Sequence, residues 1–438
     1  MGKKAQVRHF IEQLSQTANT LPDKRAGRHN QIYQIKDAVL GAFSVFFTQS
    51  PSFLAHQRDM KRQHGRSNAN SIFHMKQIPS DNHIRSLLDP APAASYEANY
   101  MYLWNRLETQ GKLKAFNVWG NRLLIGIDGL QHFSSTRLCC HNCYQQKKGE
   151  TIHYSHRVLT AFAVHPKQTE VIPFIPEFIL PQDGAKKQDS ETAAAKRWLK
   201  RHESWLQKRR AVIMGDDLFS RQPFCELVIE ANLSFIFVCK PESHETLYQW
   251  IEGMVRGGKL EEITCRVWNG RFREIWRYRY ARDVPLRAGD DGLRVNWCDL
   301  TVTHERTGEQ LYHNSFVTDL AVDKEQVKII THAGRGRWKH ENEGHNVLTT
   351  KGYHVKHNFG HGQEHLASVL FTLNMLAFLL HTFLQLTDTT YKKVRAELGA
   401  RQTFFGDVQT LLRYWQFESW EALLNFMAIR LELEPAPD

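Results

Sequence analysis

Two short apolar segments of the chain each end in an aspartate. They are residues 122–128, with the sequence RLLIGID, and residues 211–216, with the sequence AVIMGD. Continuously apolar runs of this kind are typical of strands that are buried on both faces of a sheet. Such strands would deliver the side chains of Asp128 and Asp216 to one edge of that sheet. The sequence therefore predicts a buried sheet with two carboxylates at its edge.

The segments around these strands predict a mixed α/β core. Its expected elements are strands at 122–128, 154–164 and 171–174, a charged helix at 186–209, a strand at 211–216, a helix at 219–231 and a strand at 233–238. Next come short alternating segments that predict an antiparallel β insertion, at 266–268, 273–281, 293–296 and 299–303. Segments 316–320 and 327–330 are expected to close the insertion or to rejoin the main sheet. The chain from residue 337 is expected to be mostly helical, with helices at 364–386 and 420–431.

The N-terminal part of the chain is predicted to be helical and basic. Helices are expected at 37–49, at 81–88 behind a cap at Ser80 and Asp81, and at 94–109 before Gly111. Residues 1–127 carry 17 Lys and Arg against 8 Asp and Glu, while the rest of the chain carries 40 against 38. This distribution is typical of a polyanion-binding region on a balanced body, although a solubilising surface charge would produce it too.

These patterns divide the chain into five parts. We expect a basic helical DNA-binding region at 1–115, the two halves of the α/β core at 116–240 and 319–395, a β insertion at 241–318, and a helical region at 396–438. Seven cysteines, an odd number, make a full disulfide framework unexpected. The apolar run 366–386 contains several polar side chains, which favours a buried core helix over a membrane span. Together with the absence of a signal-peptide pattern, this predicts a cytoplasmic protein without a membrane partner.

Three carboxylates are the candidates for chemistry. Asp128 precedes Gly129, which permits a sharp turn, and Asp216 precedes Asp217, for which a helix cap or a solvated turn is the preferred interpretation. Glu341 is expected at the start of a helical segment behind the basic stretch 335–339, where a surface salt bridge is the alternative. Carboxylates suit Mg²⁺, a hard cation that prefers oxygen ligands. About three of them can hold the two ions that activate the attacking oxygen and stabilise the leaving oxygen in phosphoryl transfer.

Four segments together resemble the DDE transposases of bacterial insertion sequences. They are the Asp-Gly pair after the first strand, the sequence GDDLF at 215–219, the sequence RWKHE at 337–341, and residues 351–362 with the apolar helix behind them. The resemblance is to the superfamily with a β-rich domain inserted between the second Asp and the Glu. In that group Tyr or Phe follows the second Asp by three residues, and Arg precedes the Glu by four. Asp216 with Phe219, and Arg337 with Glu341, fit this spacing.

The sequence departs from the family pattern at two positions. Gly334 stands where Tyr is expected, and Leu348 stands where Lys is expected, with Lys351 as the nearest basic residue. These departures leave Glu343 as a rival to Glu341 for the third ligand. The fold that the resemblance implies is a ribonuclease-H-like mixed sheet with flanking helices, interrupted by the antiparallel β insertion, with helical N-terminal and C-terminal regions.

The function that the resemblance implies is DNA transposition. Metal-dependent cleavage at the transposon ends would be followed by strand transfer into target DNA. Asp128 would bridge two Mg²⁺ ions, for which Mn²⁺ can substitute, while Asp216 and Glu341 would each hold one. Arg337 and Lys351 would contact phosphate, and Lys240 is a further predicted DNA contact. A homodimer would act on double-stranded DNA, associated with the bacterial nucleoid. The alternatives are a noncatalytic domesticated DNA-binding protein and a nuclease of the same fold.

The β insertion interleaves cations with aromatic side chains. These residues are Arg271, Arg273, Trp276, Arg277, Tyr278, Arg279, Tyr280 and Arg282. Such a surface can stack bases and neutralise phosphates, and Trp276 is a candidate for holding a flipped base. An ordinary strand with aromatic residues in the core and arginines in solvent would give the same pattern. Trp276, Arg277 and Arg279 are the predicted DNA contacts of this segment.

Two further groups have the side chains of metal ligands. Cys140, Cys143, His153 and His156 have the ligand types of a Cys₂His₂ zinc site, and the spacing of the two cysteines is suitable. Free thiols are the alternative. A second group, of histidines alone, consists of His354, His357, His361 and His365. Contacts with a DNA strand, or packing, are favoured over a metal for this second group.

Overall fold

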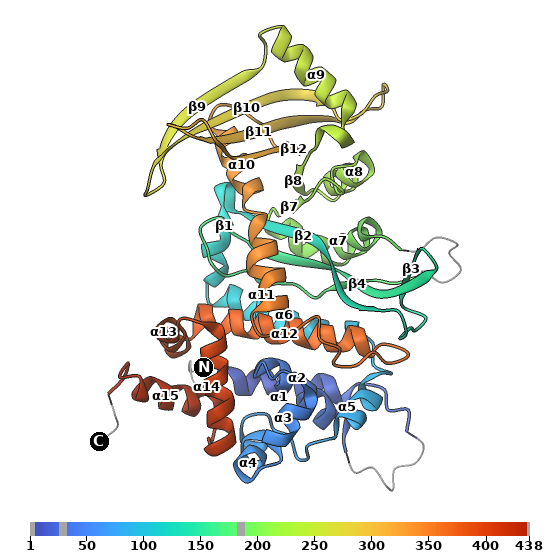
Figure 1. The fold of residues 1–438 in the computed structure, drawn as a ribbon, viewed down its shortest axis with the longest axis vertical. Helices are drawn as coiled ribbons and strands as arrows, with labels where there is room; N and C mark the ends of the chain where they lie inside the picture. The colour runs from blue at the N-terminus through green and yellow to red at the C-terminus, as the bar shows by residue number, and fades with distance from the viewer. Residues whose placement is uncertain (1–4, 26–32, 182–188, 436–438) are drawn as a thin grey trace.

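The computed structural model describes residues 5–25, 33–181 and 189–435. These residues form a twelve-stranded mixed sheet with helices on both faces, and a block of helices lies at one end of the molecule (Figure 1). The predicted α/β class is therefore confirmed.

The centre of the sheet consists of four strands from the predicted core. They are β2 (Arg122–Ser135), β4 (Thr151–Val164), β7 (Val212–Gly215) and β8 (Ser234–Val238). β4 runs antiparallel to β2, while β7 is parallel to β2 and β8 is parallel to β7. Three short strands pair with the outer edge of β4, namely β3 (Tyr144–Lys148), β5 (Ile172–Pro173) and β6 (Glu177–Ile179). β1 (Asn117–Val118) pairs with the start of β2.

The later strands extend the same sheet. β9 (Glu261–Trp268), β10 (Arg273–Pro285), β11 (Arg294–His304) and β12 (Gln310–Thr318) form an antiparallel meander. Its last strand, β12, pairs antiparallel with β8 and so joins the meander to the core. The two segments expected at 293–296 and 299–303 are one continuous strand. Helix α9 (Glu245–Arg256) packs against this extension (Figure 1).

The strand predicted at 327–330 is wrong, because this segment lies inside helix α10 (Gln326–Arg335). Its apolar, β-branched sequence VKII favours a strand when it is considered alone. The Asp323 carboxylate, however, accepts hydrogen bonds from the backbone N–H groups of Glu325 (2.8 Å) and Gln326 (2.7 Å), which caps the start of a helix. The helix then packs its apolar side against the sheet extension.

Helices cover the two faces of the core sheet from different parts of the chain. Two glycines of β2, three residues apart, mark the opposite faces, because side chains alternate along a strand. A Cβ atom on Gly126 would meet His340, and one on Gly129 would meet Glu191. The first face is therefore covered by the segment after α10, which includes a π-helix at His340–His345 and α11 (Asn346–Thr350). The second face is covered by α7 (Glu191–Lys208), and α8 (Gln222–Glu230) packs on β8 beside α7.

The helical block combines both ends of the chain. Its N-terminal members are α1 (Gln6–Asn19), α2 (Ile35–Phe47), α3 (Phe53–Met60), α4 (Gln63–Ser71), α5 (Asp81–Leu88) and α6 (Glu97–Thr109). Its C-terminal members are α12 (Leu366–Thr387), α13 (Thr389–Leu398), α14 (Arg401–Tyr414) and α15 (Trp420–Arg430). Short 3₁₀ turns connect elements elsewhere, at Ala93–Tyr96, Lys112–Phe116, Trp119–Asn121 and Pro241–Ser243. The blue and red helices lie side by side in Figure 1.

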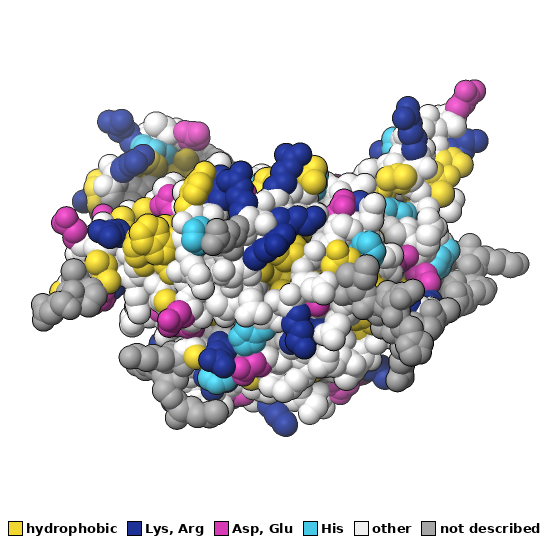
Figure 2. Space-filling model, turned by 90° about the horizontal axis from the view of Figure 1, so that it is seen from below, with side chains coloured by type: hydrophobic (Ala, Val, Ile, Leu, Met, Phe, Trp, Pro, Cys, Tyr) yellow, Lys and Arg dark blue, Asp and Glu magenta, His cyan; other side chains and the backbone are white. Residues whose placement is uncertain are grey.

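Long-range hydrogen bonds join the two groups of helices. The Asn68 side-chain amide donates to the carbonyl oxygens of Leu412 (2.8 Å) and Trp415 (2.7 Å). Helix α12 is apolar and long enough to cross a membrane, yet its most apolar window is entirely buried between α2, α6 and the sheet. The expectation of a buried core helix is confirmed. On the face formed by the terminal helices, Lys and Arg side chains are interspersed with Asp, Glu and His (Figure 2).

The N-terminus of α12 is capped by a residue from the other group of helices. The Asp89 carboxylate accepts hydrogen bonds from the backbone N–H groups at 363, 364, 365 and 366, at 2.9–3.1 Å. Burial raises the pKa of Asp89, but these four hydrogen bonds outweigh burial and lower that pKa below its ordinary value of 3.8. A carboxylate at a helix N-terminus is also stabilised by the helix dipole.

We expect the Asp89→Ala variant to lose about 2 kcal/mol of unfolding free energy at neutral pH, because the capping hydrogen bonds disappear. Since the folded-state pKa is depressed, the contribution of Asp89 is present above pH 3.8 and is lost as the pH falls through that lowered pKa. Denaturant titrations of both proteins at several pH values measure this. Asp81→Ala, which breaks a partly exposed surface ion pair with Arg85, is the control, with an expected cost of about 0.5 kcal/mol or less. Equal losses in the two variants would contradict the role of the cap.

Candidate metal centre at the sheet edge

Asp128 and Asp216 lie together because β2 and β7 are parallel and in register. Gly126 pairs with Met214 in this ladder. Asp128 lies two residues after Gly126, and Asp216 lies two residues after Met214. Partners in parallel strands project from the same face of the sheet. The two carboxylates are close enough for Asp216 to raise the pKa of Asp128 by charge repulsion. The central prediction from the sequence, that these two side chains share one edge, agrees with this arrangement.

The Asp128 carboxylate is partly buried and surrounded by opposing influences. Burial has the largest effect and raises the pKa of Asp128. The charge of Arg337 lowers this pKa, while repulsion from Asp216 and Glu191 raises it, and the resulting pKa is about 6. Arg337 Nη1 lies 3.8 Å from Asp128 Oδ2, and the backbone N–H of Gly129 donates to Oδ1 at 2.9 Å. Arg337, predicted to contact phosphate, therefore lies beside the first aspartate.

Glu191 is a third carboxylate at this centre that the sequence interpretation did not identify. It is the first residue of α7, and its carboxylate lies directly over Gly129, where a Cβ atom would come within 2.3 Å of Glu191 Cδ. Burial raises the pKa of Glu191, repulsion from Asp216 raises it further, and Arg157 lowers it. Gly129 thus leaves room for this carboxylate, which would have to shift if a side chain stood at position 129.

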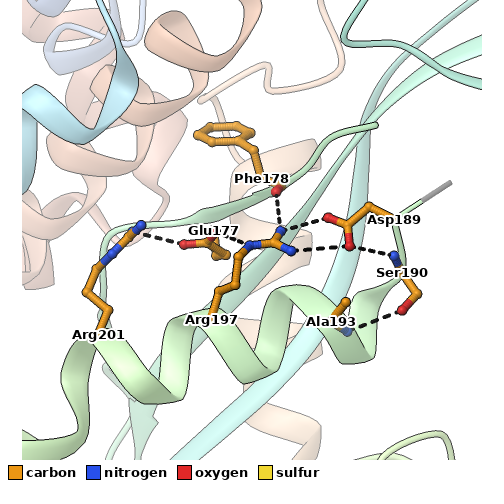
Figure 3. Close-up of polar contacts among 7 residues, drawn as sticks. All are labelled: Glu177, Phe178, Asp189, Ser190, Ala193, Arg197 and Arg201. Atoms are coloured by element: carbon orange, nitrogen blue, oxygen red, sulfur yellow. Dashed lines mark hydrogen bonds and ion pairs between the residues drawn. The ribbon is translucent and has the colours of Figure 1, made fainter. Parts of the chain in front are cut away.

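A network of arginines holds the start of α7, and with it Glu191, in place (Figure 3). Ser190 caps the helix by accepting a hydrogen bond from the backbone N–H of Ala193 at 3.2 Å. Arg197, on the next turns of the helix, forms ion pairs with Asp189 at 2.7 Å and with Glu177 of β6 at 2.9 Å. Ser190 followed by an acidic residue is a recognisable signal for a helix start. The sequence prediction instead began this helix at residue 186, outside the described residues.

The segment that carries Glu341 is not a regular α-helix. Glu341 is exposed and belongs to the π-helix His340–His345, and within the described residues its side chain makes no hydrogen bond or ion pair. His340 and His345 instead face the core, with their Nε2 atoms 2.9 and 2.7 Å from Thr160 Oγ1. Thr160 is the β4 partner of Asp128 and donates a hydrogen bond to its backbone carbonyl at 3.2 Å.

These histidines are neutral side chains beside the acidic centre. Burial lowers the pKa of His345 to about 4 and lowers the pKa of His340 well below its ordinary value. Glu343, the rival of Glu341, lines a separate pocket with Arg395 and Arg401. The geometry therefore gives Glu343 a different environment from that of Asp128.

The other predicted DNA contacts differ in whether their side chains are exposed to solvent. Lys351, Lys240 and Arg277 are exposed. Trp276 is buried at 8% exposure, and its ring stacks on His332 of α10 at 4.9 Å, so it is not presented to a base in solvent. Arg279 pairs with the buried carboxylate of Asp299 at 2.9 Å. Core packing thus accounts for Trp276, as in the alternative that the strand pattern had left open. Arg279, which that alternative placed in solvent, is instead held by its ion pair with Asp299.

Asp217 has a structural role next to Asp216. Its carboxylate accepts a hydrogen bond from the backbone N–H of Lys240 at 2.7 Å and one from the Ser243 hydroxyl. It therefore holds the turn that follows β8, in place of the predicted cap or solvated turn.

The cysteine and histidine residues of the predicted zinc site are only partly brought together. Cys140, Cys143 and His156 converge, and the fourth member of the group is His361 in place of His153. His153 and His156 are three residues apart on β4, so their side chains point to opposite faces of the sheet. His361 comes from the histidine group for which a metal had been disfavoured. A hydrogen bond with Cys143 is the main cause that lowers the pKa of the Cys140 thiol.

The chain matches no family model and no curated protein sequence. The geometry of the two side-chain groups is consequently the basis for assigning a function.

We expect Asp128→Asn to raise the apparent Tm above pH 6 in the absence of divalent cations, because it removes a carboxylate that burial and its neighbours destabilise. The raised pKa of about 6 means that the wild-type protein loses stability, on the order of 2 kcal/mol, as the pH rises from 3.8 through 6. Thermal unfolding at pH 4 and pH 8 tests this, with the difference expected only at pH 8. Asp217→Ala should instead lower the Tm, because the Asp217 carboxylate accepts hydrogen bonds from Lys240 and Ser243 that alanine cannot accept. A lower Tm for Asp128→Asn at pH 8 would refute the interpretation.

Proposed function

We propose that the protein is a Mg²⁺-dependent DNA transposase with a ribonuclease-H-like core. The observation that carries this proposal is the meeting of Asp128 and Asp216 at the ends of two adjacent parallel strands. The strand order β6–β4–β2–β7–β8, with β4 and β6 antiparallel to their neighbours, supports the ribonuclease-H-like assignment. The antiparallel meander between β8 and the helical segment of Glu341 supports the resemblance to transposases with a β-rich insertion.

The acidic centre is chemically suited to Mg²⁺. Its three carboxylates offer oxygen atoms, the ligands that Mg²⁺ prefers. His340 and His345 also each place a ring nitrogen within 4.8 Å of the Asp128 carboxylate. Burial raises the pKa of both Asp128 and Glu191, and repulsion from Asp216 raises each pKa further. A divalent cation would relieve this repulsion. Bound Mg²⁺ would supply activation of the attacking oxygen and charge stabilisation on the leaving oxygen.

The residues of the chain have separate tasks in this proposal. Asp128 and Asp216 hold the cation from a rigid sheet edge, and Glu341 contributes an exposed carboxylate from the helical segment that brings Arg337 to Asp128. Arg337 orients the phosphate group next to the scissile bond. Glu191 acts as a positioning residue, because it faces the pair from α7 across Gly129. The exposed Lys240, Arg277 and Lys351 neutralise backbone phosphates of double-stranded DNA.

The remaining features of the proposal follow from the reaction. A homodimer joins two transposon ends on DNA, and the protein acts in the bacterial cytoplasm at the nucleoid. A noncatalytic DNA-binding protein of the same fold is the second candidate, and it is favoured by Glu341, which is exposed and is not among the charged groups that most shift the pKa of Asp128. If the wild-type protein binds DNA but does not cleave it, the noncatalytic function is supported and the transposase function is not.

A strand-nicking assay tests the proposed activity. The substrate is supercoiled DNA carrying the flanks of the gene that encodes the chain, incubated with the full-length protein and Mg²⁺ or Mn²⁺. We expect nicking by the wild type and losses of at least about 10²-fold in Asp128→Ala and Asp216→Ala, because each removes charge stabilisation in the transition state. DNA binding, measured in parallel, is expected to persist. Equal nicking by wild type and both variants would refute the proposal.

The carboxylates outside the aspartate pair can be distinguished by their metal dependence. We expect Glu341→Gln to abolish nicking at every Mg²⁺ concentration. Glu191→Gln should retain activity but require about 10-fold more Mg²⁺ for half-maximal nicking, in the range for loss of an outer-shell partner. Glu343→Gln, in a separate pocket, is the matched control and should behave as wild type. Loss of nicking in Glu343→Gln, with activity retained in Glu341→Gln, would transfer the third-ligand role to Glu343.

A further inference from the structure

Four side chains from three separate segments converge beside the paired strands β2 and β4. Cys140 and Cys143 lie in the turn between β2 and β3, His156 lies on β4, and His361 lies just before α12. All four potential ligand atoms lie within 4.8 Å of one another. Cys143 and His156 are almost fully buried, while Cys140 and His361 are half-buried. Both cysteines are free thiols.

The distances between these atoms match the edges of a zinc tetrahedron. Bond lengths of about 2.3 Å to sulfur and about 2.0 Å to nitrogen imply edges of about 3.8 Å for S···S, about 3.5 Å for S···N and about 3.3 Å for N···N. The observed Cys140 Sγ···Cys143 Sγ distance is 3.8 Å. The three recorded S···Nε2 distances are 3.4, 3.5 and 3.6 Å, and the two Nε2 atoms are 3.1 Å apart.

The surroundings orient these atoms inward. His361 Nδ1 lies 2.9 Å from the carbonyl oxygen of Gly362. A carbonyl only accepts, so Nδ1 carries the hydrogen and the Nε2 lone pair is free for a metal, as in most histidine ligands. The Cys140 backbone N–H donates to Cys143 Sγ at 3.4 Å, and the Cys143 N–H donates to the Cys140 carbonyl at 3.1 Å. This tight turn presents both sulfurs to the same point.

We propose that Cys140, Cys143, His156 and His361 bind a structural Zn²⁺ ion. Four protein ligands leave no open coordination position, which distinguishes a structural site from a catalytic one. The ligand set spans more than two hundred residues of sequence and joins the core sheet to the segment that precedes α12. This inference is independent of the proposed transposase activity, because the acidic centre shares no ligand with it.

The zinc ion would brace a segment that is already held from its other side. Asp89, in the helical block, binds the backbone of residues 363–366, directly after His361. Asn142, between the two cysteines, donates a hydrogen bond to the Glu364 carbonyl. Sheet, loop and helical block therefore meet at this point, and the metal would supply the strongest of the three attachments.

Metal analysis of the purified full-length protein tests the site. We expect one zinc ion per chain by elemental mass spectrometry, and at least about 100-fold weaker zinc binding in Cys143→Ser and His361→Asn, more than the loss of an outer-shell partner costs. His153→Asn and Cys139→Ser are the matched controls and should keep one zinc ion, since neither residue belongs to the converging group. Zinc lost in His153→Asn but kept in His361→Asn would overturn the ligand assignment.

A second measurement uses the wild-type protein and does not depend on how the variants fold. Co²⁺ replacing the metal is expected to give the intense visible bands of a tetrahedral site together with thiolate charge-transfer absorption. Zinc should also protect two cysteines from a thiol reagent, and a chelator should expose them and lower the Tm. A protein that takes up neither Zn²⁺ nor Co²⁺ under reducing conditions, with all accessible thiols reactive throughout, would refute the site.

Discussion

The parallel pairing of β2 with β7 is the interaction on which the acidic centre depends. Backbone hydrogen bonds set the register of the two strands, and a shift of one residue would turn Asp128 and Asp216 to different faces. Burial is the main cause of the raised pKa of Asp128, and repulsion from Asp216 adds to it. A buried sheet can sustain such repulsion because its apolar packing holds the strand ends in place.

The second organising feature is the attachment of the segment before α12. This segment lies between the core sheet and the helical block. Asp89 binds its backbone from one side, and Asn142 and Cys143, in the turn between β2 and β3, contact Glu364 and His361 from the other. Helix α12 begins there and extends through the interior of the helical block. The two ends of the chain are therefore coupled to the sheet through one short loop, which is also where the proposed zinc ion would bind.

Strong local signals made much of the fold predictable. The apolar runs at β2, β7 and β8 and the cap at Ser80 correspond closely to the observed elements, because buried strands and helix starts leave patterns in adjacent residues. The failures occur where tertiary contacts outweigh local preference. Residues 327–330 form a helix on the sheet, and Trp276 packs against that helix. The π-helix changes the register near Glu341, so α-helical spacing does not identify which side chains face Asp128.

The sequence by itself determined the α/β class, the buried strands and the pairing of Asp128 with Asp216, because these depend on residues close together in the chain or on the regular geometry of parallel strands. Only the tertiary structure decided that Glu191 approaches the aspartate pair and that His361, in place of His153, joins the cysteines. Both outcomes depend on how distant segments pack on opposite faces of one sheet. Sequence spacing contains no record of that packing.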